Sequence, residues 1–144
     1  MSRFQDSKKL IMRYFNEIEG SAPEDVGQVV KRYAVEEYLW RGVYPFRELH
    51  GVDAAVETFW QPLMGAGKHM QRRQDIFIAG TNEIGGGEWV MSMGHFMGLF
   101  DAEWLGIRPT GKMINLRYAE FNRVENGRIA ETGLFVDLIG FMQQ

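Results

Sequence analysis

The sequence predicts an α+β fold in which N-terminal helices pack on one face of a curved, mostly antiparallel sheet. Two observations predict it. Apolar residues recur at helical spacing through the first half of the chain, and long alternating segments follow from about residue 69. Asn126-Gly127 joins two of those segments, which is a strong β-hairpin signal. A sheet that curves over helices leaves a conical cavity, and the 144 residues fit one domain spanning 1–144.

Apolar stripes predict the first two helices. Residues 6–19 form the first, since one face carries Ile11, Tyr14, Phe15 and Ile18, and Gly20 suits its end. Ser21 and Glu24 have the spacing of a capping box, with Pro23 in the first turn, which predicts that a second helix begins there. Its apolar stripe consists of Val26, Val29, Val30 and Tyr33.

An aromatic segment separates these helices from a third. Residues 37–46 contain Trp40 and are irregular, which predicts an extended piece or a loop. The third helix follows His50-Gly51 and ends at Gly65 and Gly67. One face of this helix carries Val56, Phe59, Trp60 and Leu63.

The rest of the chain is predicted to form a meander of strands. The expected strands are 69–79, 88–100, 112–124 and 128–136, and a short helix or turn follows at 138–144. Gly85-Gly86-Gly87 lacks the Gly-Lys-Ser/Thr and the helix of a phosphate-binding loop, so we predict a turn there. Residues 101–108 are expected to form a loop.

Composition narrows the functional classes. The apolar fraction of 45% and the charged fraction of 24% are typical of a globular protein, and the absence of cysteine excludes disulfides and thiolate sites. The net charge of -3 comes from mixed signs without a basic block, which argues against nucleic-acid binding. No segment approaches the roughly 20 apolar residues of a membrane span, and the N-terminus lacks an apolar signal core, so we expect a cytoplasmic protein.

Methionine and aromatic residues concentrate around the strand at 88–100. His95 is predicted to share one strand face with Trp89, Met91, Met93 and Met97, and Trp104 follows in the next loop. These side chains are either ordinary core or the walls of an adaptable apolar pocket, and their concentration favours the pocket. His95 could donate to a substrate carbonyl or relay a proton there; the alternative is a hydrogen-bonded core histidine.

Asp137 is the main candidate for acid/base chemistry. It lies among Gly133, Leu134, Phe135, Val136, Leu138 and Ile139. A carboxylate in an apolar cavity loses solvation, so its pKa rises and it becomes a better base. The alternative is an aspartate at a strand end that caps the terminal turn.

The roles of several further polar residues remain open. Arg117 and Tyr118 point to opposite faces of one strand, so only one can line the cavity; Arg117 would pair with Asp137 or a substrate anion, and Tyr118 would donate to an oxyanion. His50 is expected to be structural or to give access to the pocket, and His69 is expected at the surface. The three histidines form no close pair, so we predict no metal site.

The ordered motifs resemble the SnoaL-like polyketide cyclase family, which has the cone-shaped α+β barrel of nuclear transport factor 2. The resemblance is densest from residue 89 to 137. It rests on His50-Gly51, Gly94-His95, Gly98, Leu105-Gly106-Ile107, Pro109-Thr110-Gly111-Lys112, Phe121, Arg123, Glu125, Gly127-Arg128-Ile129, Glu131 and Asp137.

The resemblance implies an enzyme that closes a ring by intramolecular aldol condensation without a metal or cofactor. It implies that Asp137 is the general acid/base and that His95 binds or polarises a small apolar, aromatic ketone or ester. Isomerisation, dehydration and ligand binding without catalysis stay open as alternatives. It also implies a homodimer formed through the sheet face. The candidate substrate contacts are Trp89, Met91, Met93, Met97, Trp104, Arg117, Tyr118, Gly133, Trp40, Phe59 and His50.

One segment departs from the family pattern. Members commonly have Glu-His-Trp where this chain has Glu131-Thr132-Gly133. Gly133 and Asp137 share strand parity, so the missing tryptophan is expected to enlarge or reshape the pocket floor.

Overall fold

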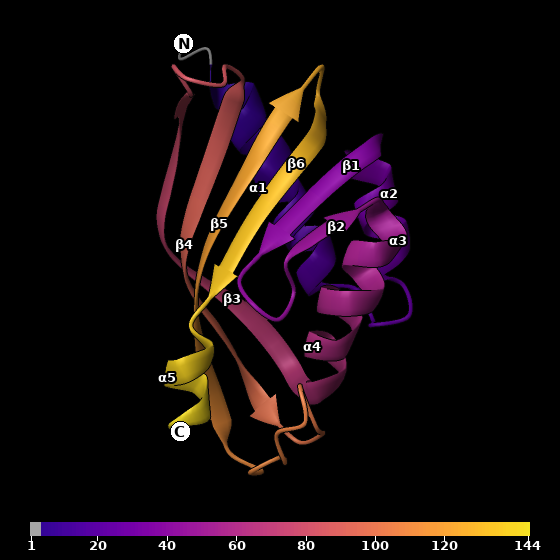
Figure 1. Ribbon diagram of the computed structural model, residues 1–144, viewed down its shortest axis with the longest axis vertical. Helices are drawn as coiled ribbons and strands as arrows, with labels where there is room; N and C mark the ends of the chain where they lie inside the picture. The colour runs from indigo at the N-terminus through magenta and orange to yellow at the C-terminus, as the bar shows by residue number, and fades with distance from the viewer. Residues whose placement is uncertain (1–3) are drawn as a thin grey trace.

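A computed structural model describes residues 4–144 and confirms the predicted α+β class. Six strands form one curved sheet in the order β2-β1-β6-β5-β4-β3, and α1 lies behind it in the view of Figure 1. Among residues 4–144, no helix is long and apolar enough to cross a membrane. Residues 1–3 lie outside the described residues. They are part of the N-terminal segment that was predicted to lack a signal peptide.

The predicted helices are present, with one correction at the second. The helices are α1 (Gln5–Glu19), α2 (Val26–Tyr33), α3 (Val52–Ala55), a π-helical segment η1 (Val56–Trp60), α4 (Gln61–Ala66) and α5 (Leu138–Met142). The capping box at Ser21 is wrong, because the Ser21 hydroxyl donates to the Ile18 carbonyl at 2.8 Å instead. The second helix therefore begins later than predicted, after Asp25.

The strand meander matches the sequence closely. The strands are β1 (Ala34–Gly42), β2 (Glu48–His50), β3 (Gly67–Thr81), β4 (Glu88–Phe100), β5 (Met113–Glu125) and β6 (Arg128–Val136). Asn126 and Gly127 have φ angles of 52° and 76°, the pair of positive values that a tight hairpin turn requires. The extended part of the aromatic segment is β1, which pairs in parallel with β6.

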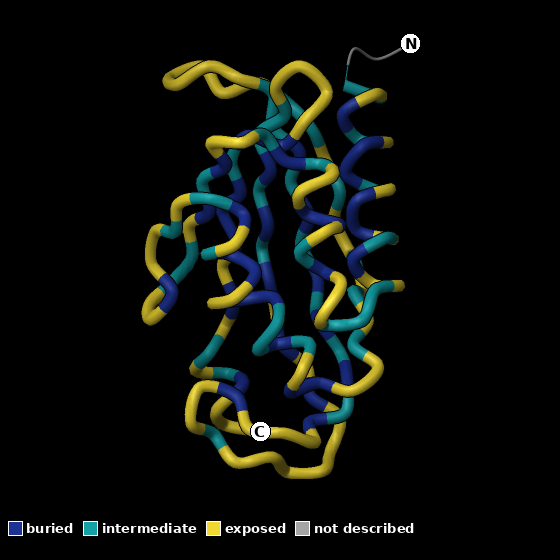
Figure 2. Tube along the Cα trace, turned by 90° about the vertical axis from the view of Figure 1, so that its right-hand side faces the viewer, coloured by how far each residue is buried: buried dark blue, intermediate teal, exposed yellow. Residues whose placement is uncertain are grey.

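The two faces of the sheet differ in burial. On β4 and β5 the even-numbered side chains are buried against the helices, among them Ser92, Phe96, Leu116 and Tyr118. Odd-numbered residues on β4 are only half-buried, because no helix covers their face. In Figure 2 the buried residues gather between the helices and the sheet, and the exposed ones gather on the loops at the two ends.

Candidate functional site

A cavity of about 330 Å³ opens where the end of α1, the helix α4 and the start of β3 meet. Its volume falls at the lower end of the range for small-molecule sites. Its apolar walls come from both helices and from the inner face of the sheet. The apolar lining residues are Phe15, Ile18, Pro23, Trp60, Leu63, Met64, Met70 and Phe96, and the polar ones are Glu19, Ser21, Lys68, His69, Gln71 and Arg72.

Arg72 is the most unusual side chain of this lining. Only 6% of it is exposed, and its Nη1 atom lies 2.9 Å from Oε1 of Glu120, which is fully buried. The guanidinium carbon sits 3.5 Å from the centre of the Phe15 ring and 4.9 Å from the ring centres of Phe96 and Tyr118. A charged group in an apolar interior requires such a partner and such contacts, because desolvation alone would be prohibitive.

A chain of buried polar groups supports the Arg72–Glu120 pair from behind. Asn122 donates to Oε2 of Glu120 at 3.0 Å, and Thr132 donates to the Asn122 amide oxygen at 2.6 Å. Tyr38, on β1, donates in turn to the Thr132 hydroxyl at 2.5 Å. Since each member orients the next across β5, β6 and β1, the position of Glu120 is strongly constrained.

Three donor atoms of residues that line the cavity are buried without a hydrogen-bond partner in the described part of the chain. The 2.9 Å contact with Glu120 lies off the N–H directions of Arg72, so Nη1 and Nη2 have no hydrogen-bond partner among residues 4–144. The same holds for Nε1 of Trp60, which is buried at the end of the π-helical segment. Buried donors without partners are costly. Almost none of their surface is accessible, so a ligand in the cavity would reach them only after a movement of the surrounding side chains.

His69 stands at the mouth of the cavity. Its backbone has a φ angle of 55°, and it lies where the pairing of β3 with β4 shifts register. Non-glycine residues in this left-handed region are uncommon and are enriched at functional sites. The sequence placed His69 at the surface; its side chain is exposed, but it also lines the cavity.

The predicted strand face of His95 is oriented the other way. Five residues predicted to form a pocket wall lie half-buried on the outer sheet face and do not line the Arg72 cavity: Trp89, Met91, Met93, His95 and Met97. The inner face of β4 belongs to Ser92, Gly94, Phe96 and Gly98. Nδ1 of His95 lies 3.6 Å from the Asp75 carboxylate on the neighbouring strand.

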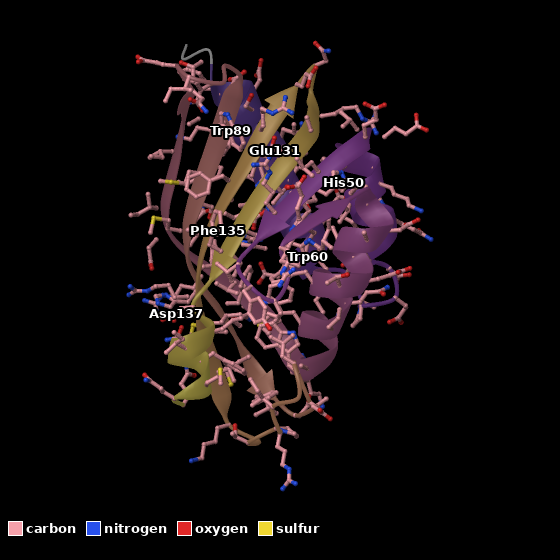
Figure 3. The ribbon with its side chains drawn as sticks, viewed as in Figure 1. His50, Trp60, Trp89, Glu131, Phe135 and Asp137 are labelled. Carbon is pink, nitrogen blue, oxygen red and sulfur yellow. The ribbon has the colours of Figure 1, made fainter. Side chains whose placement is uncertain are left out.

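Asp137 lies at the end of β6 and outside the Arg72 cavity. Its carboxylate accepts a hydrogen bond of 2.9 Å from the backbone N–H of Gly140, which caps α5, and the residue is exposed. The expected apolar surroundings are therefore absent. Figure 3 shows Asp137 beside α5, whereas Trp60 lies between the sheet and the helices. Its catalytic role stays a prediction of the family resemblance.

The structure resolves the choice between Arg117 and Tyr118. Tyr118 points inward, but its hydroxyl shares a 2.8 Å hydrogen bond with Ser92, which in turn donates to Gln74 at 2.7 Å. Arg117 is exposed on the outer face. Gly133 is also directed outward, toward the Phe135 ring, so it forms no part of a pocket floor.

The remaining predicted contacts do not line the cavity. Trp40, Phe59 and Trp104 are fully buried and pack around Phe46, which makes them core. His50 is 79% exposed and lies 3.3 Å from Glu48, and it borders a separate polar depression beside α3. Phe59 nevertheless packs edge-on against the neighbouring Trp60, which does line the cavity.

Sequence reasoning missed Arg72 and Glu120 as a pair. The start of β3 is rich in polar residues and therefore suggested a surface strand. The alternation along β3 did carry a signal. Arg72 pairs with Phe96 and Gln74 pairs with Gly94, so both lie on the inward face of the sheet with their partners. The partners of the β3 residues can be identified only when the register of β3 against β4 is known.

Comparison with known proteins places this geometry in a family. The family model of the SnoaL-like polyketide cyclases matches residues 69–144, just over half of the chain. No curated protein matches the sequence.

Solved structures share the fold. A protein described as a SnoaL-like polyketide cyclase from Jannaschia sp. CCS1 is 18% identical, with a TM-score of 0.81 over 99% of this chain and 94% of that chain. One described as a polyketide cyclase from Acidithiobacillus ferrooxidans is 18% identical, with a TM-score of 0.76 over 100% and 96%. IdmH from Streptomyces antibioticus is 15% identical, with a TM-score of 0.75 over 96% of both chains. Together with the family match and the helix-covered cone, these likenesses lead to one conclusion: the chain belongs to the SnoaL-like polyketide cyclase family.

Proposed function

We propose that this protein is an enzyme that removes a proton from carbon next to a carbonyl group, as in aldol-type ring closure, on a small and largely apolar compound. The observation that carries the proposal is an apolar cavity that His69 lines together with the cationic side chains of Lys68 and Arg72. Enolate formation places negative charge on an oxygen, and preorganised donors in a low-dielectric site stabilise that charge.

His69 is the proposed base. An imidazole accepts a proton near neutral pH, and His69 is the one histidine that lines this cavity. It would take the proton from the α-carbon, and the negative charge would pass to the enolate oxygen. The enolate carbon would then bond to a second carbonyl carbon, and the proton on His69 would pass to the new alkoxide oxygen. The reaction is balanced without any other reagent.

Asp137 is the rival base, on the strength of the family resemblance. Its exposure and its capping of α5 argue for a structural role, whereas its place near the end of β6 is the reason for considering it. Replacement of His69 and replacement of Asp137 are expected to have opposite effects on proton exchange, so one experiment distinguishes the two candidate bases.

The test follows α-proton exchange in heavy water by NMR, with a panel of aromatic β-ketoesters. We expect exchange with the wild-type protein and a loss of roughly 100-fold or more in His69→Gln, the usual effect of removing a general base. His50→Gln and His95→Gln are matched controls, because both remove an imidazole that lies outside the cavity. Asp137→Asn should retain exchange.

The opposite pattern would reassign the base. Exchange that survives His69→Gln and disappears in Asp137→Asn would remove His69 from the mechanism. Binding of the esters without any exchange would favour a protein that only binds small molecules in the same cone.

A further inference from the structure

We infer that Met70 determines the size of the ligand that the Arg72 cavity accepts, because Gly67 and Gly98 leave room for its side chain beside the cavity. We call the space that the missing side chains of these two glycines leave the methionine slot. The inference deepens the proposed function by limiting the size of its substrate. It rests on that function only for the reaction, not for binding.

A β-bulge turns Met70 toward the cavity. In the pairing of β3 with β4, His69 and Met70 together stand opposite the single residue Gly98. Gly98 belongs to the inner face of β4, and Met70 lines the cavity beside it. Bulges commonly redirect side chains next to functional sites. The same bulge holds His69 at a φ angle of 55°, so it places the proposed base and Met70 at neighbouring positions of the lining.

The side chain of Met70 occupies space that is free only because two neighbours are glycines. A Cβ atom at Gly67 would overlap the terminal methyl group of Met70. A Cβ atom at Gly98 would lie 3.2 Å from Sδ of Met70 and 3.1 Å from the carbonyl oxygen of Lys68. The sheet backbone thus bounds the methionine slot on one side, and the cavity that Gly67 and Met70 both line lies on the other. A methionine displaced from the slot would therefore move into the cavity.

The chemistry of methionine suits a movable wall. Its side chain is unbranched and flexible and forms no strong hydrogen bond, so it can change its position at little cost. Met70 is partly buried and packs against the core. Its position in the slot keeps the cavity open, and any other position would fill part of the cavity.

The volume of the cavity shows which ligands such a change would affect. A water molecule occupies about 30 Å³ in the liquid, so a cavity of about 330 Å³ holds on the order of a dozen non-hydrogen atoms. An aromatic ketone with two fused rings is about this size, whereas a ketone with one ring leaves part of the space unused. A displaced methionine end should therefore exclude the larger ketone and tolerate the smaller one.

Binding of two neutral ketones, acetophenone with one ring and 2-acetonaphthone with two, tests the inference by calorimetry. We expect the wild-type protein to bind both. Gly67→Ala should weaken the binding of 2-acetonaphthone by roughly tenfold or more, as overpacking of a filled site does, and should leave that of acetophenone almost unchanged. Since Gly67 has extended backbone angles and the displaced group is the flexible end of a side chain, this variant should keep nearly the wild-type stability.

Gly65→Ala is the matched control. It adds the same methyl group to the preceding helix α4, at a position where a Cβ atom meets nothing within 4 Å and which does not line the cavity. It should bind both ketones as the wild-type protein does.

Two variants of Met70 identify the side chain that is responsible. Gly67→Ala/Met70→Ala removes the group that the new methyl would displace, so it should restore the binding of 2-acetonaphthone to the wild-type level or above. Met70→Ala alone removes part of the wall, so it should admit 2-acetylanthracene, a three-ring ketone that the wild-type protein should exclude. Neither variant leaves a buried charge unpaired, so both should remain folded.

Several outcomes would overturn the inference. One is an unchanged affinity of Gly67→Ala for 2-acetonaphthone; another is an equal loss of both ketones, which would indicate a general distortion of β3. A double variant that is not restored would show that Met70 is not the displaced group, and exclusion of 2-acetylanthracene by Met70→Ala would show that it does not limit size. Wild-type protein that binds neither ketone would also overturn it, since a cavity held open for aromatic rings should take them.

These results are separable from the test of the proposed function. Size-selective binding of the ketones without any proton exchange would support the role of Met70 and count against the reaction. Proton exchange of a two-ring β-ketoester that Gly67→Ala leaves unchanged would overturn the role of Met70 and leave the reaction in place.

Discussion

Arg72 shows how one residue can combine folding and function. Its aliphatic stem and its guanidinium are buried among aromatic rings, a position that is tolerable only because Glu120 neutralises it. Glu120 is tolerable in turn because Arg72 and Asn122 contact its two oxygens. The pair therefore contributes less to stability than a packed apolar cluster of the same size would. Stability therefore does not explain why a charged residue stands in the lining of the cavity.

Tyr14 and Tyr38 give this interior a measurable pH dependence. Burial raises the pKa of Tyr38, and the negative charge of Glu120 raises it further; burial also raises the pKa of Tyr14. Since the unfolded state loses these protons near pH 10 and the folded state retains them, stability present below pH 10 should fall as pH rises above it. Each tyrosine contributes a slope of up to about 1.4 kcal/mol per pH unit.

Urea unfolding at pH values from 8 to 11 measures this slope. Tyr38→Phe should be less stable by about 1 kcal/mol at pH 8, since the hydrogen bond to Thr132 is lost, and its stability should fall less steeply above pH 10. Tyr44→Phe is the control, because that ring is 75% exposed. An unchanged slope in Tyr38→Phe would contradict the account.

At the scale of elements, β4 shows what sequence alternation can and cannot determine. The ends of β4 and of β6 were predicted to the residue, because turn residues flank both strands. The direction of the β4 faces was predicted wrongly. Both faces of β4 are apolar, with phenylalanines on one and methionines on the other, and a shift of one residue exchanges them. The inner face also carries a polar residue, Ser92, which is buried and hydrogen-bonded to Tyr118 and Gln74.

Contacts between strands that are distant in the sequence could not be predicted for a related reason. The partnership of Arg72 with Glu120 joins β3 to β5 across β4, so it depends on two registers and on the bulges of β3. The family resemblance supplied the fold and the cone, but not which polar groups point into it. Gly94 and Gly98 were noticed as motif residues, and the structure gives them a packing reason.

At Gly94 the backbone of β3 leaves no room for a side chain on β4. A Cβ atom at Gly94 would overlap the carbonyl oxygen of Arg73 on the neighbouring strand, a backbone atom that cannot move aside. We expect Gly94→Ala to lower the free energy of unfolding by about 1–3 kcal/mol, as overpacking does. Displacement of β3 should also move Arg72 and weaken ligand binding.

Gly80→Ala is the matched control, since Gly80 lies on the same strand pair and a Cβ atom there meets nothing within 4 Å. It should leave stability unchanged or raise it by up to about 1 kcal/mol. The urea concentrations at the unfolding midpoints of Gly94→Ala and Gly80→Ala test this prediction. Equal midpoints would show that β3 and β4 can separate at Gly94 without a loss of stability.

At the scale of the whole molecule, the outer sheet face has no covering layer. Two apolar rows cross the strands at paired positions, Ile78–Met91–Phe121–Gly133 and Ile76–Met93–Ala119–Phe135. A basic row, Arg73–His95–Arg117, lies beside them. The β4 residues that were predicted to contact a substrate are thus part of this outer sheet face. The chain exposes 8249 Å², whereas a monomer of its mass exposes about 7,600 Å² on average.

We propose that a second copy of the chain covers this face. Methionine and aromatic side chains, which these rows contain, are enriched in protein interfaces. A two-fold arrangement would pack the apolar rows of both copies together and leave the basic row near the rim, beside Asp75.

Sedimentation velocity at micromolar concentration should therefore detect a dimer. Ile78→Glu places a charge in an apolar row where the side chain is 52% exposed, so it should give a folded monomer. Ile84→Glu is the control, because that side chain is 99% exposed on the turn between β3 and β4, outside the rows, and the variant should remain dimeric. A monomeric wild-type protein would contradict the proposal. Because the Arg72 cavity lies on the opposite side of the sheet from these rows, Ile78→Glu should keep its proton exchange, which separates assembly from chemistry.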